Sequence, residues 1–394
     1  MPGQRGRREE FTTGRVGEHG RTFLHQIIFA DWFCIRGAGR SILLFSAIPV
    51  LWHDRFHPGH AAFRNRDFCK NALRGAYSLE PYFVYFNFSL FLARNLCFSD
   101  LVYFAAPVIQ KVNQYLSLIK FSHTVFALPF ASIGFLLAVK KVRFFEGELF
   151  LYMILCMVFA RSAAMAFNRY IDRHFDAMNP RTKNREIPAG VIDSNSALLF
   201  TILSSVAFVV TTYFINRICF YLSPVALLVV LGYSYTKRFT ALCHLVLGVG
   251  LSLAPIGAYL AVTGKFSLLP LLFSFTVLTW VSGFDIIYAL PDTDFDRSQK
   301  LHSIPAWLGI KGALRFSEML HVLTLCFVIW AGLRGNFGFL YWTGTGIFTL
   351  LLIYQHAIVK PDDLSKVNIA FGTTNGIASV LFACFTISDM FFLQ

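Results

Sequence analysis

The sequence predicts an all-α membrane protein whose helices form a bundle around a central cavity. Hydrophobic residues make up 56% of the 394 residues and charged residues only 14%, which is far more apolar than a soluble globular domain. From Ser122 onward, long apolar stretches alternate with short polar loops, and about twenty apolar residues span a bilayer as a helix. About nine transmembrane helices are expected, over residues 122–139, 149–167, 197–215, 219–235, 244–262, 267–289, 313–332, 338–359 and 369–392.

Residues 1–107 differ in composition from the rest of the chain, since Lys70 is their only lysine among many arginines. The apolar stretch 42–52 is too short to cross a bilayer, and the Arg- and Gly-rich start is not a signal peptide. We expect an N-terminal extension over 1–107 that is poorly ordered or not part of the native protein, followed by a membrane domain over 108–394. A membrane-associated accessory domain is the alternative for the first segment.

The net charge of +13 does not indicate a nucleic-acid partner, because after residue 110 the basic residues fall between apolar spans. The eight cysteines are scattered singly, without a CxxC pair, so we interpret them as small core residues rather than disulfides or zinc ligands. Membrane lipid is the expected environment, and no protein partner can be inferred.

A polar helix end follows the apolar stretch 149–167. Asn168, Asp172 and Asp176 recur at four-residue spacing, which places them on one face of an α-helix, one turn apart. Carboxylates at the end of a membrane-spanning helix are costly, so they usually face a cavity and have a function.

A second acidic group lies at the end of the sixth expected span, residues 267–289. Asp285, Tyr288, Asp292 and Asp296 form the pattern DxxYxxxDxxxD. Two such helices facing each other would make a pocket rich in carboxylate oxygens, which suits Mg²⁺. The structural alternative is a helix-end cluster held by salt bridges. The functional alternative is a transporter whose intramembrane acids move ions or protons.

The two motifs, NxxxDxxxD and DxxYxxxDxxxD, resemble those of the UbiA superfamily of intramembrane aromatic prenyltransferases. The flanking segment 180–190 (PRTKNREIPAG) and the pair Gly283-Phe284 are similar to that family too, and Tyr233-x3-Lys237 resembles its YxxxK motif. The resemblance covers about residue 119 to the C-terminus. Segments 122–130 and 160–169 look most like the group that prenylates 4-hydroxybenzoate.

This resemblance implies transfer of a polyprenyl group from a polyprenyl diphosphate to a hydroxylated aromatic acid in quinone synthesis. The acceptor is 4-hydroxybenzoate for ubiquinone or 1,4-dihydroxy-6-naphthoate for menaquinone. Carboxylates repel a diphosphate, so Mg²⁺ has to bridge them, and it stabilises the leaving diphosphate. The expected ligands of magnesium and diphosphate are Asn168, Asp172, Asp176, Asp292 and Asp296.

Further side chains complete the expected site. Tyr233 and Lys237 would contact the diphosphate, and Arg185, with Arg181 and Lys183, could close over it or bind lipid phosphate. The Tyr288 ring is a candidate to stabilise the allylic carbocation by a cation–π contact. The expected catalytic residues are Asp172, Asp176, Asp292, Asp296, Tyr288 and Lys237, and the expected substrate-binding residues are Asn168, Tyr233, Arg161, Arg185 and Asp285.

Arg161 stands seven residues before Asn168, so it shares that helix face roughly 10 Å deeper in the membrane. A buried Arg in a spanning helix needs a partner. The carboxylate of an aromatic acceptor is one candidate, and a carboxylate on another span, such as Glu318, is the structural alternative.

The loop charges predict the orientation. If the first span starts in the cytoplasm, most basic loop residues and both motifs lie on the cytoplasmic side, as the positive-inside rule requires. Lys140, Lys141 and Arg143 run against this bias. We therefore expect an integral protein of a bacterial inner membrane whose active site faces the cytoplasm.

Overall fold

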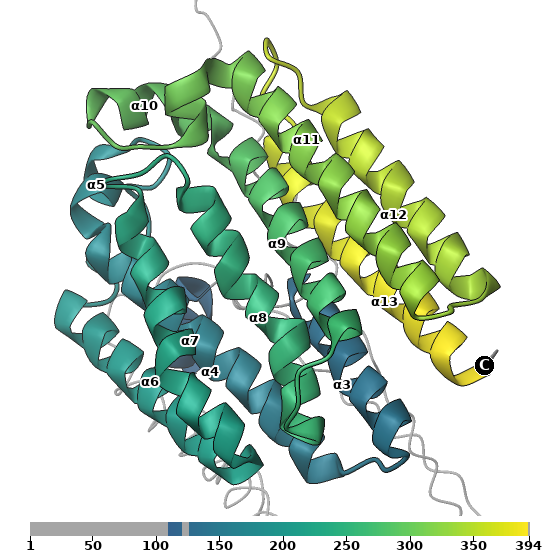
Figure 1. Cartoon of the computed structure of the whole chain (residues 1–394). Helices are drawn as coiled ribbons and strands as arrows, with labels where there is room; N and C mark the ends of the chain where they lie inside the picture. Colours follow the sequence, from purple (N-terminus) through teal and green to yellow (C-terminus); the bar gives the residue numbers. More distant parts are fainter. Residues whose placement is uncertain (1–108, 120–125, 393–394) are drawn as a thin grey trace, which may run out of the picture. The chain divides into compact units, whose positions relative to one another are not determined.

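The computed structural model describes residues 109–119 and 126–392, and Figure 1 shows a bundle of long helices in this part of the chain. The prediction about residues 1–107 lies outside the described residues. A short helix over residues 109–118 comes first, and its Leu118 is fully buried against Ala166, Ile192 and Ala197. The next helices are α3 (Leu128–Val142), α4 (Gly147–Ile171), α5 (Arg173–Met178), α6 (Ser194–Ile215), α7 (Arg217–Thr236) and α8 (Cys243–Thr263).

The second half of the bundle follows without any strand among the described residues. Its elements are α9 (Leu268–Ala289), the 3-10 turn η2 (Leu290–Asp292), α10 (Thr293–Ser298), α11 (Ile304–Arg334), α12 (Phe339–Ile358), the π-helical turn η3 (Ile369–Thr374) and α13 (Asn375–Phe392).

Each expected span overlaps one long helix, and the protein is an all-α integral membrane protein. Seven helical segments of the described chain are long and apolar enough to cross a membrane. They are α4, α6, α7, α8, α11 and the segments Leu268–Ser298 and Ile369–Phe392. The helix α3, with 15 residues, and α12 do not belong to this group, so a count of nine spans stays a prediction.

Polar caps set several helix ends at the loops. The Asp193 carboxylate accepts hydrogen bonds from two backbone N–H groups at the start of α6, and the Ser303 hydroxyl accepts one at the start of α11. Such caps satisfy donors that the first helical turn leaves unpaired. The helix α11 therefore begins earlier than the expected residue 313 and bends at Gly309, whose φ of +70° favours glycine.

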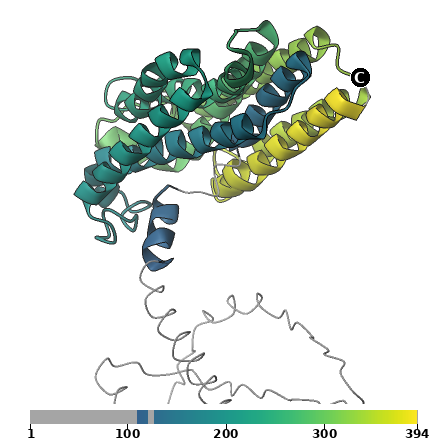
Figure 2. The same cartoon turned by 90° about the horizontal axis from the view of Figure 1, so that it is seen from below.

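Neighbouring helices contact one another around the whole bundle. The order is α3, α4, α6, α7, α8, α9, α11, α12, α13 and back to α3. Figure 2 shows α3 and α13 side by side, although they lie near opposite ends of the described chain. The helices α3 and α8 also pack together, so they separate a first group (α4, α6, α7) from a second (α9, α11, α12, α13).

Aromatic and aliphatic side chains fill the second group. Trp280 of α9 is fully buried, with Phe130, Phe284 and Phe348 around its ring at centroid distances of 5.4, 5.1 and 5.7 Å. Its indole Nε1 donates a 3.1 Å hydrogen bond to Asn375 Oδ1 on α13. This hydrogen bond joins α9 to α13.

The contact between α3 and α8 requires a glycine. A Cβ on Gly134 would lie 2.1 Å from the Pro255 carbonyl oxygen, which is backbone and cannot move aside alone. We expect Gly134→Ala to destabilise the protein by about 1–3 kcal/mol through overpacking, measured as a lower Tm in detergent. Gly257→Ala is the matched control, because nothing lies within 4 Å of a Cβ there. Equal Tm values for the two variants would contradict this account of the contact.

Candidate active site

The first acidic motif lies where α4 ends and α5 begins. Asp172 interrupts the helix, with φ −89° and ψ 5°, so the expected single helix is two. The backbone N–H of Asp172 nevertheless donates to Asn168 O (2.9 Å), and that of Asp176 donates to Asp172 O (2.8 Å). Asn168 Nδ2 also donates to Asp172 Oδ2 over 3.1 Å. The three side chains therefore keep their four-residue spacing across the break.

The second motif spans three elements at the same end of the bundle. Asp285 and Tyr288 belong to α9, Asp292 ends η2, and Asp296 lies in α10. Asp292 and Asp296 are buried, whereas Asp294, which is out of phase with them, is exposed. Figure 1 shows α5 and α10 together at one end of the bundle.

The loop between α5 and α6 bridges the two motifs. Asn179 Nδ2 donates to Asp292 Oδ1 over 3.1 Å, and the Arg181 guanidinium pairs with the other oxygen of Asp292. From the same loop, Arg185 Nη1 donates to Asp176 Oδ1 over 2.7 Å. One loop thus holds a carboxylate of each motif, which is the convergence that the sequence predicted for the two acidic helices.

The loop after α7 adds two more bases. Lys237 Nζ lies 2.7 Å from Asp296 Oδ1, and Arg238 Nη2 lies 3.6 Å from Asp172 Oδ1. Burial lowers the pKa of Lys237, but the Asp296 and Asp292 carboxylates outweigh it and raise that pKa overall. Lys237 is therefore a charged side chain at the pH of the cell.

For Asp172, the effect of burial on the pKa outweighs the attraction of the neighbouring cations. Burial, and then repulsion from Asp176, raise its pKa to about 6, against the attraction of Lys237 and Arg238. A carboxyl whose pKa is higher in the folded than in the unfolded state destabilises the fold once it ionises, and this penalty disappears at low pH.

We therefore expect Asp172→Asn to raise the Tm of the metal-free protein at pH 7.5. The gain should shrink as the pH falls through 6 toward the unfolded value of 3.8. Thermal unfolding in EDTA at several pH values measures this difference against the unmodified protein. A gain that grows on acidification would show that the sign is wrong.

The site suits magnesium in the type of its donors. Carboxylate and amide oxygens are ligands that Mg²⁺ prefers. Asp176 Oδ2 is buried and has no hydrogen bond among the described residues, and Arg169 Nη1 lies 4.0 Å from it. Within the described ranges, no three acidic, His or Cys side chains converge on one point that could hold an ion. Basic side chains from two loops and from α4 lie against these carboxylates.

An apolar cavity of about 380 Å³ lies within the first group of helices and α8. Its wall is formed by α4, α6, α7 and α8, and two of its polar side chains are Arg161 and Tyr233. Tyr233 lies one helical turn before Lys237, which contacts Asp296. Tyr233 therefore connects the wall of the apolar cavity with the second acidic motif.

Arg161 lies in the cavity wall, as its depth on α4 predicts. Its Nε is buried and has no hydrogen-bond partner among the described residues. Glu318, the expected structural partner, instead lies 4.0 Å from His356 Nδ1 on α12. The salt bridge between Arg161 and Glu318 is therefore not formed.

Two further predicted residues have partners that the spacing did not indicate. Asp285 Oδ2 lies 2.7 Å from Nδ1 of His244, a histidine that the sequence analysis did not assign to the site. The Tyr288 ring stacks on Phe371 at 4.0 Å between centroids, and the Arg181 guanidinium lies over it at 4.8 Å. The cation on the Tyr288 ring in this structure is thus Arg181.

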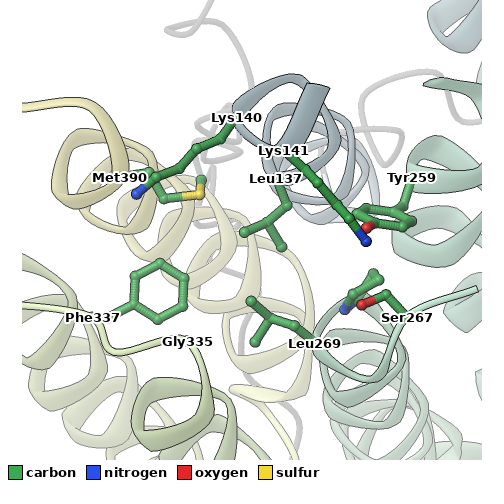
Figure 3. Close-up of a pocket in the computed structure, with 10 residues that line it drawn as sticks. Leu137, Lys140, Lys141, Tyr259, Ser267, Leu269, Gly335, Phe337 and Met390 are labelled. Carbon is green, nitrogen blue, oxygen red and sulfur yellow. The ribbon is translucent and has the colours of Figure 1, made fainter. Parts of the chain in front are cut away.

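A second hollow of about 240 Å³ lies at the opposite end of the bundle, away from both motifs (Figure 3). Lys140 and Lys141 lie at its edge, with Met390 and Tyr259 beside them. Lys141 Nζ is 5.8 Å from the centre of the Tyr259 ring. This hollow holds none of the predicted site residues.

Several residues that hold the acidic side chains could not be predicted from residue spacing. They lie far along the chain from the acid that each contacts: Asn179 from Asp292, Arg238 from Asp172 and His244 from Asp285. Arg169 could have been found, because it stands seven residues before Asp176 and a helix places such residues on one face.

The chain forms a bundle of membrane helices with an apolar cavity and, at one end, a cluster of acidic and basic side chains. Residues 127–383 match the UbiA prenyltransferase family. The chain belongs to this family and is a prenyltransferase, which confirms the resemblance and excludes the transporter alternative.

Curated relatives and solved structures agree with this assignment. The chain is 30% identical over 245 residues to the 4-hydroxybenzoate octaprenyltransferase of Nitrosospira multiformis, covering 60% of this chain and 81% of that protein. A UbiA homologue from Aeropyrum pernix K1 is 33% identical with a TM-score of 0.62, covering 68% of this chain and 98% of that one. A homologue from Archaeoglobus fulgidus bound to GPP and Mg²⁺ has the same fold, at 19% identity and a TM-score of 0.54, covering 70% and 99%.

Proposed function

We propose that the protein transfers a polyprenyl group from a polyprenyl diphosphate to the ring of 4-hydroxybenzoate, in a magnesium-dependent step of ubiquinone biosynthesis. The observation that carries this proposal is the junction of an apolar cavity with a cluster of carboxylates and bases. The names of the curated relatives support 4-hydroxybenzoate as the acceptor. The second acceptor, 1,4-dihydroxy-6-naphthoate, also carries a carboxylate and a phenol.

The donor has a tail that belongs in lipid and a strongly anionic head. The cavity offers the tail an apolar wall, and its volume of about 380 Å³ falls in the range of small-molecule sites. The head would meet the bases Arg181, Arg185, Lys237 and Arg238, whose N–H groups are strong donors to phosphate oxygens.

Magnesium would be held by Asn168, Asp172, Asp176, Asp292 and Asp296, where it supplies charge that stabilises the diphosphate as a leaving group. The chain's own contribution is to hold these side chains in place at one end of the bundle. The guanidinium groups of Arg181 and Arg185 contact Asp292 and Asp176 directly.

The acceptor would bind deeper in the cavity than the diphosphate. The Arg161 guanidinium can hold its carboxylate, since Arg161 lies in the cavity wall with Nε unpaired and a guanidinium binds a carboxylate through two parallel hydrogen bonds. Departure of the diphosphate leaves an allylic carbocation. Tyr288 would stabilise it through its ring face once the Arg181 guanidinium leaves that face. The motif end of the bundle would face the cytoplasm of a bacterial inner membrane, according to the loop charges.

Competition between the two acceptors tests the substrate assignment. The purified protein in nanodiscs receives octaprenyl diphosphate, Mg²⁺ and equal concentrations of 4-hydroxybenzoate and 1,4-dihydroxy-6-naphthoate. Mass spectrometry should find mainly the prenylated benzoate. A mainly naphthoate-derived product would assign the enzyme to menaquinone synthesis instead.

A further inference from the structure

The acids of the two motifs differ in the kind of base that they contact. Asp176 and Asp292 pair with arginines, Asp296 pairs with Lys237, and Asp172 lies near Arg238. Among these described acids Asp285 alone pairs with a histidine, His244, over 2.7 Å. A histidine beside a carboxylate is a common arrangement where an enzyme moves a proton.

The His244–Asp285 pair lies where the cavity meets the polar site. Asp285 lies one helical turn before Tyr288, whose ring contacts the Arg181 guanidinium of the polar site. Leu247, one helical turn after His244 on α8, lines the apolar cavity. The Asp285 side chain is 21% exposed and that of His244 only 5%, so the accessible atoms of the pair belong mainly to the carboxylate.

One ring nitrogen of His244 contacts the Asp285 carboxylate. Its Nδ1 donates a hydrogen bond of 2.7 Å to Asp285 Oδ2. The other ring nitrogen, Nε2, is buried and has no hydrogen-bond partner in the described part of the chain. A buried unpaired nitrogen is unfavourable, which is hard to reconcile with a histidine placed there for stability.

We propose that His244 is a positioning residue of the transfer reaction, which holds the Asp285 carboxylate to take up the ring proton of the aromatic acceptor. This inference rests on the proposed function. When the prenyl carbon has bonded to the ring carbon beside the phenol, that ring carbon still carries its hydrogen. Asp285 removes it as a proton, the C–H electron pair returns to the ring, and no oxidant or reductant is needed.

An isotope competition measures the proton step separately from the others. Equal amounts of 4-hydroxybenzoate and its 3,5-dideuterated form are prenylated together, and the two product masses are compared. In the unmodified protein we expect equal amounts of the two products, because proton loss follows a slower bond-forming step. In His244→Leu we expect kcat to fall by about 10²-fold, with the KM for prenyl diphosphate unchanged. The unlabelled product should exceed the labelled one, because slow proton loss lets the new C–C bond reopen before the hydrogen is lost.

A conservative variant distinguishes positioning from packing. His244→Gln keeps an N–H donor toward Asp285, so it should recover most of the activity and the equal product amounts. His356→Gln is the control, since His356 contacts His321 on the other side of the bundle and should behave as the unmodified protein. His244→Leu with full activity and equal product amounts would overturn the proposal.

If His244→Leu does not fold, Asp285→Asn tests the proposal instead. This variant is nearly isosteric and removes the proposed base itself. It should give excess unlabelled product, and equal amounts at normal turnover would overturn the proposal. Failure of the unmodified protein to form any prenylated benzoate would instead contradict the proposed function, so the two failures are distinguishable.

Discussion

Asp292→Asn and Asp172→Asn each abolish prenyl transfer, lowering kcat by on the order of 10²–10³-fold or more, while the protein still inserts and folds. Each variant removes one negative charge from the proposed magnesium and diphosphate site and leaves a side chain of nearly the same shape. The amide at position 292 can still contact Asn179, which now donates to Asp292 Oδ1 over 3.1 Å. The measurement is product formation by mass spectrometry, with Tm as the check on folding.

Asp294→Asn is the matched control for this pair. Asp294 lies two residues after Asp292 in the same acidic segment, but its side chain is exposed. It should keep normal turnover, because the bases of the site contact the other acids of the two motifs. Near-normal turnover of Asp292→Asn would mean that the carboxylate has a structural role alone.

Arg161→Leu raises the KM for the aromatic acid by about 10–100-fold, the equivalent of the roughly 1.5–3 kcal/mol that a hydrogen bond to a charged group contributes. The KM for prenyl diphosphate should change little, because the bases expected to contact the diphosphate lie in loops outside the cavity. Steady-state kinetics with each substrate varied in turn separates the two constants.

Arg143→Leu provides the comparison for Arg161→Leu, since Arg143 follows α3 at the opposite end of the bundle and is exposed. Its kinetic constants should match those of the unmodified protein. Loss of folded Arg161→Leu protein with an unchanged acceptor KM in the remainder would indicate that Arg161 acts through packing.

Local periodicity predicts the parts of this site that lie on one helix. Asn168, Asp172 and Asp176 are four residues apart, and backbone hydrogen bonds keep that spacing through the break at Asp172. The apolar spans predict the long helices for the same reason, since in lipid a spanning segment has to satisfy its own backbone groups.

Contacts between distant segments could not be predicted in this way. Arg181 reaches Asp292 from a loop 111 residues earlier, and His244 reaches Asp285 across 41 residues. Their geometry depends on how α8 packs on α9 and on how the loop after α5 folds back, and neither is encoded in a helical period. The sequence also expected acids facing one another, whereas the structure places bases against them.

Product formation with and without magnesium tests the central claim most directly. The purified protein in nanodiscs is given a prenyl diphosphate and 4-hydroxybenzoate, either with Mg²⁺ or with EDTA, and the products are analysed by mass spectrometry. We expect a ring-prenylated benzoate with Mg²⁺ and none in EDTA, with activity restored by adding excess Mg²⁺. Equal product formation in EDTA, or no prenylated benzoate from folded protein with Mg²⁺, would contradict the account.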